Sequence, residues 1–138
     1  MAMMTISFAC GGGDGGFGSY YFFSPGVKLC YEFGEHNGFS AGIEVSAGHS
    51  FGEFGLTGLV LGTQWNFQQE GLLSYAEWEV LNPFFGGAIG MQTGEDRDIA
   101  FRVRFFAGLL GYLSAKFTTD DTDFELGLVG KYPVYPHR

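Results

Sequence analysis

Apolar and polar residues alternate along much of the chain. In the clearest run, residues 39–51, the odd positions are mostly apolar and the even positions are serine, glycine or glutamate. Similar alternation covers residues 27–34, the segment that starts at Ile99, and the last segment, 124–134. Because successive side chains of a strand point to opposite faces, this period of two predicts β-strands with two unlike faces.

Clusters of glycine, proline, asparagine and aspartate separate these runs and predict turns at 11–16, 24–26, 35–38, 68–71, 82–83, 93–98 and 118–123. The strands between them are predicted at 3–10, 17–23, 27–34, 39–51, 54–67, 72–81, 84–93, 99–117 and 124–134. The run 99–117 is long for one strand, so a reversal around Gly108 to Gly111 is an alternative. Gly58 marks a predicted bulge, because the apolar row changes phase there. Eight to ten strands with short links predict an all-β antiparallel up-and-down meander that closes into a barrel, as a single domain over 1–138.

The composition restricts how this chain meets other molecules. Its formal net charge is −8 and only 16 % of its residues are charged, which argues against nucleic acid as a partner. No stretch approaches the roughly 18 apolar residues of a membrane helix, so a membrane would have to be crossed by strands. Of the two cysteines, Cys10 and Cys30, we expect two unpaired thiols rather than a disulfide framework.

The second face of the strands is unlike a normal water-exposed surface, because glycine, serine and alanine dominate it. Its few charged residues comprise five acids and five bases, which predicts an ion-pair network in a narrow barrel interior: Lys28, Glu32, Glu44, Glu77, Glu79, Arg102, Arg104, Lys116, Glu125 and Lys131. The apolar face is then predicted to contact lipid or a partner, through Val27, Leu29, Tyr31, Ile43, Val45, Leu59, Leu61, Trp65, Phe101, Val103, Phe105, Leu126 and Leu128. The remaining acids, Asp123 among them, are expected in turns, where they form an acidic rim.

Many aromatic residues fall near the predicted strand ends, as the aromatic girdles of membrane barrels do. Together with the alternation and the charge-balanced face, this arrangement resembles the small, about eight-stranded outer-membrane-type β-barrels. The resemblance covers most of the chain and implies membrane lipid as the partner, with an outer-membrane location if the protein is exported. An eight-stranded barrel has no room for a wide channel, so we expect a structural role or loop-mediated recognition rather than a wide pore. The segment Met1–Cys10 has no basic region of the kind that opens a signal peptide.

The sequence contains few signs of catalytic chemistry. Residues 38–42 match G-x-S-x-G, but an alternating strand follows where a nucleophile elbow needs a helix. Glu77 and Glu79 share one face and are expected to pair with Arg102 and Arg104 rather than act as acid and base. We therefore expect no enzyme activity, no cofactor and no metal site. Two alternatives to a membrane barrel stay open: a soluble self-assembling structural protein (a fibre, tube or shell subunit) with its apolar faces buried between copies, and a soluble barrel whose apolar row faces inward around an apolar ligand.

Overall fold

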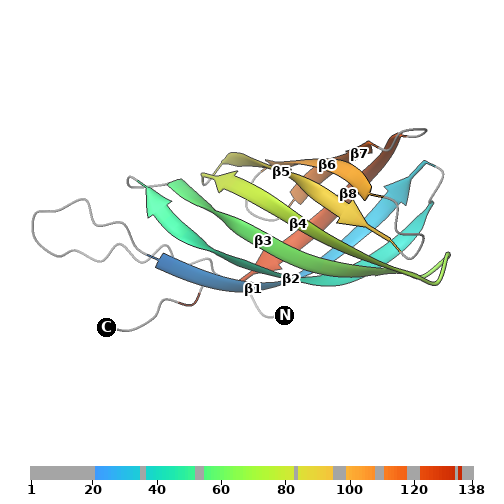
Figure 1. Cartoon of the computed structure of the whole chain (residues 1–138), viewed down its shortest axis with the longest axis horizontal. Coiled ribbons are helices and arrows are strands. Elements are labelled where there is room, and N and C mark those ends of the chain that lie inside the picture. Colours follow the sequence, from blue (N-terminus) through green and yellow to red (C-terminus); the bar gives the residue numbers. More distant parts are fainter. Residues whose placement is uncertain are drawn as a thin grey trace, which may run out of the picture.

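The computed structural model describes residues 21–34, 37–51, 55–82, 84–94, 99–107, 111–117, 122–132 and 134. Its eight strands form a closed barrel in which neighbours along the chain are antiparallel neighbours in space (Figure 1). The strands are β1 (Tyr21–Phe33), β2 (Gly38–Phe51), β3 (Gly55–Asn66), β4 (Gly71–Leu81), β5 (Phe85–Thr93), β6 (Ile99–Ala107), β7 (Gly111–Phe117) and β8 (Thr122–Lys131). The predicted all-β meander barrel is confirmed, with β1 pairing β8 to close it.

The register shows how strongly the strands are staggered. A path through paired residues leaves β1 at Phe22, passes Gly48 and Arg104 among others, and returns to β1 at Glu32, ten residues further along. For eight strands this stagger corresponds to a tilt of about 40° from the barrel axis. A barrel of this size has an interior just wide enough to be filled by side chains.

The predicted turn at 24–26 is wrong, because β1 runs straight through it. The carbonyl of Pro25 accepts a hydrogen bond of 2.9 Å from the amide of Tyr132. The nitrogen of Pro25, which has no hydrogen to donate, therefore lies on the same side of β1, facing the end of β8. Regular pairing with β8 stops at Gly26 and Lys131, and the ladder to β2 is continuous across Pro25. Proline is tolerated at such an edge position.

Three other expectations need correction or refinement. Gly58 is not a bulge, since its register with both β2 and β4 is unbroken; Leu56 instead belongs to the inner row. The run 99–117 divides into β6 and β7, as the alternative prediction of a chain reversal within this run requires. The turn predicted at 118–123 is too long, because β8 already begins at Thr122. The predicted strand 3–10 and most of the predicted strand 17–23 lie outside the described residues.

The barrel has two ends, which we call the Tyr21 end and the Phe33 end after the limits of β1. The links at the Tyr21 end are residues 52–54, 82–84 and 108–110, and those at the Phe33 end are 34–37, 67–70, 94–98 and 118–121. All of these links are three to five residues long. Most predicted rim acids fall in the links of the Phe33 end, and several of them lie outside the described residues.

Candidate functional site

Within the described segments, the strands of the barrel place all their acidic and basic side chains on one face. The inner rows contain every Asp, Glu, Lys and Arg of these strands, and the outer rows contain none of them. The largest fully buried side chains include Arg102, Arg104 and Lys28. The interior is thus filled mainly by polar groups, with a small apolar cluster of Cys30, Ala88, Phe106, Tyr112 and Val129.

Glu125 of β8 is the centre of the first group of interactions. Its Oε1 lies 3.0 Å from Lys28 Nζ and 2.8 Å from Arg102 Nη2, and it accepts a hydrogen bond of 2.6 Å from the Tyr112 hydroxyl. Its Oε2 accepts a hydrogen bond of 2.9 Å from Gln64 Nε2. This carboxylate therefore connects β1, β3, β6 and β7 to β8 across the barrel interior.

The two arginines of β6 lie at the centre of the second group. Arg104 Nη1 is 2.9 Å from Glu44 Oε2, and Arg104 Nη2 contacts Glu77 Oε2. Arg102 Nε is 2.6 Å from Glu77 Oε1. The hydroxyl of Tyr75 donates to Glu44 Oε2 at 2.6 Å. Buried charges are tolerated only when they are paired and hydrogen-bonded in this way.

Lys131 closes the network on the side of the Tyr21 end. Its Nζ lies 3.0 Å from Glu44 Oε1 and 2.5 Å from Glu79 Oε2, and it donates to Ser46 Oγ at 2.8 Å. Its side chain is 15 % exposed, whereas those of its two carboxylate partners are buried. Lys131 therefore lies nearer the barrel mouth and joins β8 to β2 and β4.

Toward the Phe33 end, hydrogen bonds replace some of the ion pairs. Glu32 Oε1 accepts from Ser40 Oγ at 2.9 Å and from Gln64 Nε2 at 2.7 Å. Asp123, which the sequence placed in an acidic turn, is instead a buried inner-row residue of β8, so that expectation is wrong. Lys116 pairs with Arg102 and Asp123 in register, which puts it on the inner row. The structure describes its backbone but not its side chain.

Two tyrosine rings lie among the buried cations. The Tyr75 ring centroid is 4.4 Å from Arg102 Cζ and 4.6 Å from Lys28 Nζ, distances at which cation–π attraction operates. Glycines on the neighbouring strands provide the space for these rings. A Cβ atom at Gly62 would collide with the Tyr75 ring, and one at Gly127 would lie 2.7 Å from the Tyr112 ring.

The sequence interpretation missed the neutral members of this network. Gln64, Tyr75, Tyr112 and Gln92 all contact its charged groups. The signal that could have found them is parity, because each occupies the same alternating row as charged or small residues of its own strand. Tyr75, for example, is two residues before Glu77.

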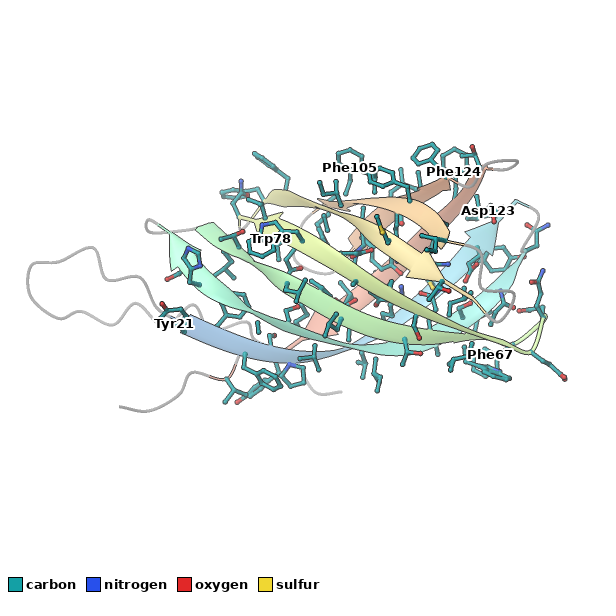
Figure 2. The ribbon with its side chains drawn as sticks, viewed as in Figure 1. Tyr21, Phe67, Trp78, Phe105, Asp123 and Phe124 are labelled. Atoms are coloured by element: carbon teal, nitrogen blue, oxygen red, sulfur yellow. The ribbon has the colours of Figure 1, made fainter. Side chains whose placement is uncertain are left out.

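The outer rows form an apolar surface around the barrel. Twelve of the thirteen residues predicted to face lipid or a partner are exposed there, from 37 % for Val45 to 63 % for Val27; the thirteenth, Val103, is half-buried on the same face. Figure 2 shows Tyr21 and Phe67 at opposite ends of the barrel, and Phe105 and Phe124 projecting from its wall. This outward orientation is the reverse of what a soluble barrel around an apolar ligand requires. Within the described residues, no helix is long and apolar enough to span a membrane.

Cys30 is a buried free thiol in the structure, and Cys10 lies outside the described residues. The Cys30 thiol and the carboxylates of Glu32 and Glu125 offer donor atoms within 4.8 Å of one another. Lys28 and Arg102 already bring two positive charges to Glu125 at this point, which disfavours a metal cation there.

No protein-family model and no curated protein sequence matches this chain. The solved structures similar to it include two of designed proteins. One, described under "De novo design of transmembrane beta-barrels", is 13 % identical with a TM-score of 0.45, and the match covers 80 % of this chain and 95 % of that one. The other, the NMR structure of the de novo designed TMB2.3, is 12 % identical with a TM-score of 0.44, covering 82 % and 95 % respectively.

Proposed function

We propose that this protein is a small membrane-embedded β-barrel whose interior is closed by ion pairs, with a structural role rather than that of a wide pore. The observation that carries the proposal is the outer surface. On the described strands it presents large apolar side chains around the whole barrel and no Asp, Glu, Lys or Arg. Monomeric soluble proteins rarely expose contiguous apolar patches beyond a few hundred Å².

The height of the apolar surface supports a bilayer as its partner. The strands contain 7 to 14 residues. With a rise of about 3.3 Å per residue and a tilt of about 40°, a strand of average length spans about 25 Å along the barrel axis. This is the height of the apolar band of transmembrane barrels. If the chain is exported, an outer membrane is the location that this architecture fits.

The interior supports a closed barrel. Arg102, Arg104, Lys28 and their carboxylate partners are all buried at the centre of the barrel, and each cation is held by a carboxylate on another strand. An ion that crossed the barrel would have to break these pairs. We also infer that Glu77 holds the two arginines of β6 in place and Glu79 holds Lys131, rather than acting in acid–base catalysis. The expected pairing of Glu79 with Arg102 or Arg104 is therefore wrong among the described contacts, because Glu79 meets Lys131 of β8 instead.

The short links favour a structural role over recognition by loops. Links of three to five residues leave little chain beyond the barrel wall to form a binding surface. Loop-borne recognition usually depends on longer segments that a rigid scaffold positions.

The test of membrane insertion compares two arginine substitutions on the outer row of β2. Ile43 lies near the middle of the strand and is 62 % exposed, and His49 lies on the same face near its end. In phosphatidylcholine vesicles, Ile43→Arg should lower the free energy of unfolding by about 2–4 kcal/mol, and the control His49→Arg by about 0–1 kcal/mol. Urea titration of vesicle-bound protein measures both, and flotation in a density gradient reports insertion.

Equal effects of the two substitutions would contradict a bilayer around the barrel. A protein that is monodisperse in buffer without detergent, and that does not float with vesicles, would also overturn the proposal. Large regular particles in buffer would instead support the alternative, in which copies of the chain cover one another's apolar faces.

A further inference from the structure

The outer wall has a groove between β4 and β5 near the Phe33 end. Its volume is about 450 Å³, and its outer-row lining comprises Ser74, Ala76, Met91, Thr93 and Ile99. The side chains of Ser74 and Ala76 are small, so the floor of the groove lies close to the strand backbone there. Met91 and Ile99, beside it, are 61 % and 68 % exposed. Among the described residues, no charged side chain lines the groove.

The groove coincides with a gap in a belt of aromatic side chains. Six strands place exposed rings on the outer face near the Phe33 end: Tyr31 and Phe33 on β1, Phe39 on β2, Trp65 on β3, Phe101 on β6, Phe117 on β7 and Phe124 on β8. At the same end, β4 and β5 offer Leu72, Ser74, Met91 and Thr93 instead. The wall is therefore thinner at β4 and β5 than at the other six strands. The rings of those six strands would face the boundary between hydrocarbon and headgroups.

We propose that this groove binds one acyl chain of a membrane phospholipid. The inference rests on the proposed membrane insertion, because the groove opens on the surface that would then contact hydrocarbon. Each methylene group that moves from the surrounding hydrocarbon into the close-fitting groove gains dispersion contacts with Ala76, Met91 and Ile99. The hydroxyls of Ser74 and Thr93, which are paired in register, lie toward the strand ends and suit the ester region of the lipid.

A lipid chain fits this groove better than a second copy of the protein does. In the described barrel every strand has a hydrogen-bonded neighbour on both sides, so no whole strand edge is left with which another chain could extend the sheet. Among the described residues, the groove is bounded by two strands and Ile99 of the next strand, which suits a narrow, flexible ligand.

The experiment fills the groove and counts retained lipid. Wild type, Ala76→Phe and the control Ala47→Phe are inserted into dimyristoylphosphatidylcholine vesicles, checked by flotation, extracted in mild detergent and weighed by native mass spectrometry. Ala47 is also an exposed outer-row alanine, on β2 between Phe23 and Leu59, away from the groove. Ser74→Leu serves as a second groove-filling variant.

Wild type and Ala47→Phe should each retain one phosphatidylcholine molecule, and Ala76→Phe and Ser74→Leu should retain about tenfold less, which corresponds to about 1.4 kcal/mol of binding free energy. Equal retention by all four proteins, or none by wild type, would overturn the site. A wild-type dimer that Ala76→Phe abolishes would show that a second copy occupies the groove. Failure of wild type to float would refute the membrane proposal itself, whereas flotation without retained lipid would refute the groove alone.

Discussion

Removing the two partners of the Lys28–Glu125 ion pair one at a time should have unequal effects. Glu125 receives Lys28 Nζ at 3.0 Å, Arg102 Nη2 at 2.8 Å, Tyr112 at 2.6 Å and Gln64 at 2.9 Å. Lys28, by contrast, contacts a single carboxylate among the described residues, that of Glu125. The pair is fully buried, so a cation left without its partner cannot be solvated by bulk water.

The magnitudes follow from this count of partners. Glu125→Gln leaves Lys28 as a buried, unpaired charge and weakens the contact of Arg102, so it should lower the free energy of unfolding by about 3–5 kcal/mol. Lys28→Met removes one charged hydrogen bond and also one buried charge, while Glu125 keeps three donors. Its expected loss is about 1–2 kcal/mol. This is less than the upper part of the range of about 1.5–3 kcal/mol that a hydrogen bond to a charged group usually contributes.

Urea titration in vesicles, followed by tryptophan fluorescence, measures both variants and the double variant. In the double variant, Lys28→Met should restore part of the stability that Glu125→Gln removes, because the unpaired cation is then gone. Equal losses from the two single substitutions, or an additive double variant, would refute the account of Glu125 as the shared centre of the interior.

Two further pairs of substitutions, measured by the same titration, test the space around Tyr75 and the bridge from Lys131 to Glu79. Gly62→Ala places a methyl group against the Tyr75 ring and should lower the free energy of unfolding by about 1–3 kcal/mol through overpacking. In the control Gly87→Ala the new Cβ meets nothing nearer than Arg104 O at 3.6 Å, so this change should be neutral or slightly stabilising. Equal losses of stability would show that the Tyr75 ring does not need the glycine. Lys131→Met should cost about 3 kcal/mol by leaving the Glu79 carboxylate buried without a cation among the described residues, and a second change, Glu79→Gln, should recover much of that loss. If Glu79→Gln instead adds to the loss, the bridge from Lys131 to Glu79 does not stabilise the barrel.

The sequence was sufficient to predict the fold class because alternation is a local signal. The odd-numbered row of 39–51 faces outward in β2, as its apolar residues indicate, and Glu44 between them faces inward. The errors occur where a local signal was overruled by the neighbouring strands. Ser24, Pro25 and Gly26 have the composition of a turn, but the ladder to β2 continues through them, and Gly58 keeps its register although the residues around it change in polarity. Thr122 and Asp123 likewise join β8 because β7 offers them partners in Lys116 and Phe117.

The partners within the network could not be predicted in the same way, because they depend on the stagger of the closed barrel. Glu44 is 60 residues from Arg104 along the chain, and Lys28 is 97 residues from Glu125. Which inner-row residues share a level is decided by the ten-residue offset that accumulates around the eight strands. A change of two residues in this offset would keep every side chain on its own face but would bring different charges together. The ion pairs across the interior therefore favour one stagger among those that the alternation allows, which gives the buried charges a part in specifying the barrel as well as in filling it.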